Sequence, residues 1–231
     1  IFQLWKTYRN PTARGHSMKI LIIASHPDDE VLGCGGIIKK WSKSHQIKVL
    51  FLTNGCDTRY DEEMIDALQE QARHAAVILG TRDVLFEKLP NQQLETIPLL
   101  EVTQTIEKYL GILKPEIVFT HHPGDLNRDH RVCYEAVLTA TRPLPNQCVK
   151  SLYTFFVPSA TEWGSSPLSI PFLPNFFVDI EDEIEFKIRA MDCYTSETRP
   201  APHPRSSESL KAYAKACGAT VGVSYAEPFS L

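Results

Sequence analysis

Two clusters of histidine and carboxylate residues have the composition of a metal site. The first is Ser25-His26-Pro27-Asp28-Asp29-Glu30, and the second runs from His121 to Arg131 (HHPGDLNRDHR). Three consecutive carboxylates repel one another unless a positive charge neutralises them, and a divalent metal ion does this well. His26 and Asp29 are three residues apart, so a turn that enters a helix can point both at one ion. A histidine from the second cluster would complete three protein ligands with an open position, the arrangement of catalytic zinc.

Asp28 lies between the two expected ligands in the sequence and would point elsewhere. It could take a proton from a metal-bound water, because zinc lowers the pKa of such a water to about 7. The competing interpretation is a proline-containing turn before an acidic helix N-terminus, where the helix dipole stabilises each carboxylate by about 0.3–1 kcal/mol. The second cluster makes that interpretation the weaker one.

The apolar pattern predicts the elements that position these clusters. Buried strands are expected at 19–25 and 47–53, and further strands at 83–89 and 116–121. Helices are expected at 31–43, 62–79, 99–113 and 128–141. This alternation indicates an α/β fold, a Rossmann-like doubly wound and mostly parallel sheet with helices on both faces. Both clusters follow strands, and ligands bind at the carboxyl ends of the strands in such sheets.

The remainder of the chain is less regular. Further strands are expected at 152–157, 176–180 and 220–225, and helices at 182–194 and 206–217. The glycines of Gly33-Cys34-Gly35-Gly36 are interpreted as close packing of a helix on the sheet. Residues 1–17 are basic and are interpreted as an added tail before a native start at Met18, or as a natural N-terminal arm. Residues 18–231 are expected to form a single domain.

Composition excludes several classes of protein. The 231 residues are 43% hydrophobic and 23% charged, which argues against disorder and low-complexity structure. A net charge of −4 gives no general attraction to nucleic acid or to anionic membranes. We expect no integral membrane segment, because no apolar run approaches about 20 residues. Six scattered cysteines without a C-x-x-C pair favour reduced thiols and a cytoplasmic protein. Aromatic residues at 172–177 are candidates for a subunit contact in a homo-oligomer, or for a lid.

Both clusters also resemble the signatures of a known enzyme family. Residues 24–30 (ASHPDDE) are similar to the A-H-P-D-D-E motif of the PIG-L/LmbE deacetylases, with Ser25 inserted. Residues 122–131 (HPGDLNRDHR) resemble the second motif of one branch. The resemblance covers Met18 to about Thr141 and continues more weakly through the stretches CYTSE at 193–197 and HPRS at 203–206. It implies a zinc-dependent hydrolase that removes an acetyl group from an N-acetylglucosamine-type sugar or glycoconjugate precursor.

The resemblance also implies roles for particular residues. His26, Asp29 and His130 would be the zinc ligands, and Asp28 would be the general base. Zinc is the expected cofactor, although a site of two histidines and one aspartate also accepts other divalent ions. Better-known members carry a general-acid histidine at the position of Asn127. An asparagine donates a hydrogen bond but cannot deliver a proton.

The proton donor is therefore open between two residues. Asp28 could return the proton that it took, or His203 could swing in and partner Asp129, and we favour His203 narrowly as a site residue. Asp129 is expected to support a metal ligand rather than to be one.

Four residues have a functional and an ordinary interpretation. Arg59 could hold a sugar hydroxyl or a phosphate, or be a solvated loop arginine. Arg131 could pair with the acidic cluster or only satisfy Asp125, and His122 could line the pocket or make ordinary loop contacts. Trp163 could stack on the apolar face of a sugar or pack as a lid residue.

Three other functions remain to be weighed. A zinc amidohydrolase acting on a different amide would use the same residues. A non-catalytic Rossmann-like binding module would be expected to have lost part of the ligand set, which is intact here. A nucleotide-binding dehydrogenase is disfavoured, because no G-x-G-x-x-G follows the first strand and carboxylates stand where a phosphate would bind.

Overall fold

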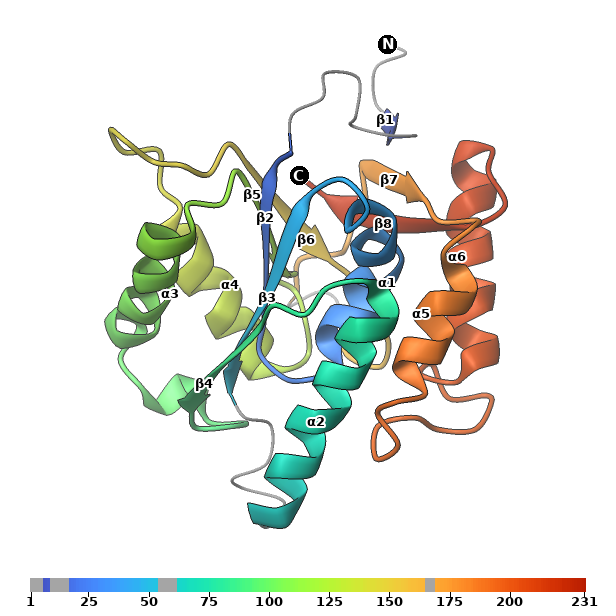
Figure 1. The fold of residues 1–231 in the computed structure, drawn as a ribbon, viewed down its shortest axis with the longest axis horizontal. Coiled ribbons are helices and arrows are strands. Elements are labelled where there is room, and N and C mark those ends of the chain that lie inside the picture. Colours follow the sequence, from blue (N-terminus) through green and yellow to red (C-terminus); the bar gives the residue numbers. More distant parts are fainter. Residues whose placement is uncertain (1–5, 9–16, 54–61, 165–168) are drawn as a thin grey trace.

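A single mixed sheet runs through the computed structural model, which describes residues 6–8, 17–53, 62–164 and 169–231. Its strands are β1 (Lys6–Tyr8), β2 (Lys19–Ala24), β3 (Gln46–Thr53), β4 (Val84–Leu89), β5 (Ile117–His121), β6 (Ser151–Phe155), β7 (Phe176–Asp179) and β8 (Ala226–Ser230). The described strands lie in the order β1-β7-β8-β6-β5-β2-β3-β4 (Figure 1). All neighbours are parallel except β8, which is antiparallel to both β6 and β7. The predicted mostly parallel α/β sheet is confirmed.

Helices cover both faces of this sheet (Figure 1). They are α1 (Asp29–Trp41), α2 (Glu62–Leu79), α3 (Leu99–Leu113), α4 (Arg128–Ala140), α5 (Ile184–Met191) and α6 (Ser207–Val221), with a short 3-10 helix η1 at Leu94–Thr96. Alternate residues of β2 serve the two faces. Ile20 and Ile22 pack in the core beneath α1, α2 and α5, whereas Leu21 and Ile23 pack in the core beneath α3 and α4. Burial on both faces explains the continuous apolar run of this strand.

Helix α1 lies unusually close to its neighbours because of its glycines. A Cβ on Gly33 would lie 2.4 Å from the Phe155 ring, and one on Gly36 would lie 2.6 Å from Ile180. These separations confirm that the glycines serve close packing of the helix on the sheet. The close approach fixes α1, whose first turn carries Asp29.

A buried ion pair ties the middle of α1 to β8 and α5. The Glu227 carboxylate of β8 accepts hydrogen bonds from the backbone N–H groups of Gly36 and Ile37, each at 2.7 Å. It also accepts one at 2.7 Å from Lys187 of α5, which in turn donates to the Leu32 carbonyl at 2.8 Å. Each charge is thus paired and hydrogen-bonded, as buried charges must be.

Three details differ from the sequence-based expectations. The predicted strand at 220–225 is wrong, because α6 continues to Val221 and ends at Gly222 with a φ of 78°. The strand lies instead at Ala226–Ser230, where Glu227 and Pro228 conceal the pattern of a strand. Phe176 and Phe177 are buried in β7 and are not exposed aromatic residues.

The N-terminal segment contributes a strand to the sheet. Lys6–Tyr8, within the segment interpreted as a tail or arm, forms the edge strand β1 and pairs with β7. Among the described residues, no helix is both long enough and apolar enough to span a membrane.

Candidate metal centre

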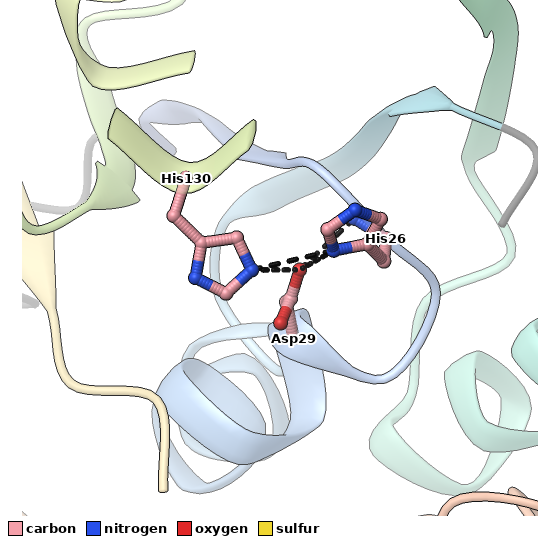
Figure 2. A group of neighbouring side chains, drawn as sticks. All are labelled: His26, Asp29 and His130. Carbon is pink, nitrogen blue, oxygen red and sulfur yellow. Dashed lines mark hydrogen bonds and ion pairs between the residues drawn. The ribbon is translucent and has the colours of Figure 1, made fainter. Parts of the chain in front are cut away.

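The two sequence clusters meet at the carboxyl end of the central strands. The loop after β2 carries His26 and leads into α1, which begins at Asp29. The loop after β5 leads into α4, whose first turn carries His130. β2 and β5 are hydrogen-bonded neighbours, so their ends bring these three side chains together. Figure 2 shows the three side chains pointing at one another.

The three side chains form an almost equilateral triangle of ligand atoms. His26 Nδ1 and His130 Nε2 lie 3.3 Å apart, and each lies 3.3 Å from Asp29 Oδ2 (Figure 2). A tetrahedral zinc ion at about 2.0–2.1 Å from its ligands separates them by about 3.3–3.4 Å. The residues therefore fit a zinc ion without rearrangement. They form the one group of three potential ligands found among the described residues.

The electrostatics of the triangle also require a positive charge. Burial lowers the pKa of His26, but the Asp129 and Asp29 carboxylates outweigh burial and raise this pKa to about 9. Burial likewise opposes protonation of His130, whose pKa the Asp29 and Asp125 carboxylates raise to about 10. Protons or a metal cation can supply the charge that these carboxylates demand.

A further carboxylate contacts each histidine of the triangle. Asp129 lies 2.9 Å from His26 Nε2, and its two oxygens accept the backbone N–H groups of Gln92 and Leu94 at 2.7 and 3.0 Å. Asp125 Oδ2 lies 3.2 Å from His130 Nδ1. A carboxylate behind a histidine ligand fixes the ring orientation and raises its basicity as a ligand. Asp129 thus lies behind His26, in contact with its Nε2.

Asp28, which lies between His26 and Asp29 in the sequence, has a strained backbone conformation. Its φ of 117° lies in a region that non-glycine residues avoid, at a cost of about 1–3 kcal/mol. Its backbone N–H donates to Glu30 Oε2 at 3.1 Å, and Arg205 Nη1 donates to its Oδ2 at 2.6 Å. Burial raises the pKa of Asp28 well above its usual value, against the opposing effect of Arg205.

Known proteins share both the sequence pattern and the fold. Residues 21–141, just over half of the chain, match the family model described as PIG-L, GlcNAc-PI de-N-acetylase. The chain belongs to the PIG-L family. One PIG-L relative, a diacetylchitobiose deacetylase of Thermococcus kodakarensis, is 32% identical over 200 residues, which cover 78% of this chain and 70% of the relative.

Two further comparisons agree with membership of the PIG-L family. An uncharacterized deacetylase of Escherichia coli, YaiS, is 28% identical over 173 residues, which cover 71% of this chain and 83% of the relative. The solved structure of an N,N′-diacetylchitobiose deacetylase from Pyrococcus horikoshii has a TM-score of 0.75 and 23% identity, and covers 93% of this chain and 83% of that one. The latter shows a shared fold.

Beside the triangle of His26, Asp29 and His130 lies a cavity of about 220 Å³. Its lining residues are His26, Pro27, Asp28, Leu68, Asn91, Gln92, Asn127, His130, Glu197 and Arg205. The sequence argument left Asn91, Gln92, Glu197 and Arg205 without roles. A signal existed for Glu197 and Arg205, since both fall in the two later stretches that extend the family resemblance.

Asn127 stands where better-known members carry the general-acid histidine, and His203 is the alternative donor. The two residues lie in different places. Asn127 lines the cavity and caps α4, because its side-chain oxygen accepts the Asp129 N–H at 2.9 Å. His203 is absent from the lining, and its Nδ1 accepts the Arg205 N–H at 3.1 Å. Burial, followed by Arg205 and Arg199, lowers the pKa of His203. The structure shows no contact between His203 and Asp129, both of which it describes.

The other expected residues make local contacts. His122 Nε2 lies 2.8 Å from the Ile170 carbonyl, and Arg131 donates to the backbone carbonyls of Asp125 and Leu126 at 2.6 and 3.0 Å. His122 thus makes a loop contact, and Arg131 reaches the backbone of Asp125. Trp163 is half exposed and its ring lies 6.0 Å from that of His203. Arg59 lies outside the described residues.

Proposed function

We propose that this PIG-L family member is a zinc-dependent N-deacetylase that hydrolyses the N-acetyl group of an N-acetylglucosamine-type sugar or of a glycoconjugate precursor. The observation that carries the proposal is the ligand triangle of His26, Asp29 and His130, with Asp28 on the wall of the same cavity. The relatives support the substrate class, because the Thermococcus protein is a diacetylchitobiose deacetylase.

Zinc held by the triangle would supply Lewis acidity, polarising the acetyl carbonyl and lowering the pKa of the attacking water. The protein supplies the proton transfers. Arg205 occupies Asp28 Oδ2, and no hydrogen bond joins Oδ1 to the part of the chain that the structure describes. Oδ1 is therefore the oxygen positioned to take the proton from water as it attacks the acetyl carbon.

We propose that Asp28 also returns this proton to the departing sugar nitrogen. The carbon–nitrogen bond then breaks to give acetate and an amine, and no further donor is needed. One carboxyl that takes the proton from water and passes it to the nitrogen is sufficient for both steps. His203 stays the alternative donor, and it would have to leave its contact with the Arg205 N–H.

The experiment is to measure metal content and acetate release on one sample, before and after chelation. We expect about one equivalent of zinc, with chelator-sensitive acetate release from N-acetylglucosamine or N,N′-diacetylchitobiose. Asp28→Asn should lower kcat by about 10²–10⁴-fold with zinc retained. Asp83→Asn is the matched control, since Asp83 is exposed and pairs with Lys48 at the surface.

Three outcomes would contradict parts of the proposal. Zinc binding with acetate release only from N-acetylated amines that are not sugars would favour the amidohydrolase on another amide. Failure to bind zinc would remove the mechanism and favour a binding module. If His203→Ala lowered kcat as strongly as Asp28→Asn while zinc stayed bound, His203 would replace Asp28 as the proton donor.

A further inference from the structure

A cationic side chain contacts the proposed base from a distant part of the chain. Arg205 precedes α6, is separated from Asp28 by 177 residues and reaches its Oδ2 at 2.6 Å through Nη1. The Arg205 side chain is 18% exposed and that of Asp28 is 4% exposed. An ion pair at this depth is weakly screened by solvent and is directional.

The guanidinium group is itself held by two further segments. The same Nη1 donates to Glu197 Oε2 at 3.0 Å, and Nε donates to Ser159 Oγ at 2.8 Å. Glu197 follows α5, Ser159 follows β6 and Asp28 follows β2, so the three residues that contact the guanidinium come from three separate loops. Arg205 and Glu197 also line the cavity. Their contacts therefore border the space where a substrate would bind.

We infer that Arg205 is the positioning residue for Asp28: by clamping Oδ2, it holds the carboxylate so that Oδ1 faces the reacting atoms. The inference rests on the proposed function and adds to it a residue that acts through the base. The backbone of Asp28, with its φ of 117°, persists only where surrounding contacts hold it, and the ion pair with Arg205 is one of these contacts. Glu197 and Ser159 serve by fixing the guanidinium in turn.

The test is a kinetic double-mutant cycle between the two residues. Arg205→Met should lower kcat by about 10–100-fold, because a displacement of about 1 Å at a reacting group costs that much. The KM for the N-acetyl sugar should change little, and zinc content should stay at one equivalent. In the Asp28→Asn background the same substitution should cost nothing further, since Arg205 then has no base to position.

Chemical rescue distinguishes positioning from a general structural role. Methylguanidinium at a non-denaturing concentration should restore several-fold of the kcat lost in Arg205→Ala, whereas the neutral analogue methylurea should not. Arg205→Lys should recover only part of the loss, because one ammonium group cannot replace a fork that spans two carboxylates and a hydroxyl. Arg199→Met is the matched control, since Arg199 lies in the same region and, among the described residues, donates to the carbonyls of Ser196 and Thr198.

The outcomes separate this inference from the proposed function. A wild-type protein that releases no acetate from any N-acetyl sugar refutes both. An active wild type with near-normal kcat in Arg205→Met refutes the positioning role alone. Equal losses from Arg205→Met in the wild-type and Asp28→Asn backgrounds would also refute it, because the arginine would then act independently of the base.

Discussion

Zinc binding should displace about two protons from the protein near neutral pH. The pKa values of about 9 for His26 and about 10 for His130 leave both imidazoles almost fully protonated at about pH 7.5 in the absence of metal. Zinc binds the neutral imidazole, so each ring must lose its proton when the metal enters. Ordinary histidines with a pKa of about 6.5 would together release only about 0.2 protons at the same pH.

The same reasoning fixes the sign and size of the pH dependence. Two displaced protons make the zinc affinity rise about 100-fold between about pH 6.5 and 7.5. Two ordinary imidazoles would give only about a threefold rise over that interval. Acidification therefore weakens metal binding steeply, because protons compete with the metal for His26 and His130.

Two measurements check this prediction. Calorimetric zinc titrations in buffers of different ionisation enthalpy give the number of protons released. Competition with a chromophoric chelator gives the affinity at each pH. His74→Asn is the control, since His74 is exposed and pairs with Glu70 away from the triangle, and it should leave both results unchanged. A release near 0.2 protons with a threefold change in zinc affinity would refute the argument that the neighbouring carboxylates keep His26 and His130 protonated in the absence of metal.

Three further predictions follow from described contacts. The metal-free protein should lose stability as the pH rises from about 6.5 through 9–10, since the raised histidine pKa values contribute stability only while the rings stay protonated. Thermal unfolding in the presence of chelator checks this. A melting temperature that does not change over this pH range would contradict it. Asp129→Asn should weaken zinc binding about 10–100-fold by removing the carboxylate behind His26, with Asp83→Asn as a neutral control in the same titration. Gly33→Ala should destabilise the fold by about 1–3 kcal/mol, because its Cβ would overlap Phe155, whereas Gly111→Ala in α3, with nothing within 4 Å, should be neutral or stabilising in urea unfolding.

Much of the first half of the fold could be predicted because its central strands are buried on both faces. β2 and the Val49–Leu52 part of β3 are continuous apolar runs for this reason, and α2 carries a clear apolar face. β8 could not be predicted in the same way. It lies inside the sheet, yet it carries Glu227, whose charge is satisfied by Lys187 and by two N–H groups of α1. When the partners of a buried charged residue come from distant parts of the chain, the sequence around that residue does not indicate a buried strand.

The same distinction separates the parts of the site. The proximity of His26, Asp29 and His130 could be predicted from the sequence, because neighbouring parallel strands end at the same edge of the sheet. Arg205 could not be placed, since it comes from a loop before α6 and depends on three other loops for its position. The resemblance to the PIG-L family marked its stretch of sequence without assigning it a contact.

The position of β8 bears on the order in which a nascent chain can mature. β7 is joined to the rest of the sheet through β8, which is translated after every other element that the structure describes. Until Ala226–Ser230 emerges, β7 has no hydrogen-bonded path to β6, and α1 lacks the Glu227 contacts in its middle. His26, Asp29 and His130 are all synthesised long before that point. The proposed metal site should therefore begin to form on a helix that still lacks its Glu227 contacts, and α1 should reach its full anchoring only late in biogenesis.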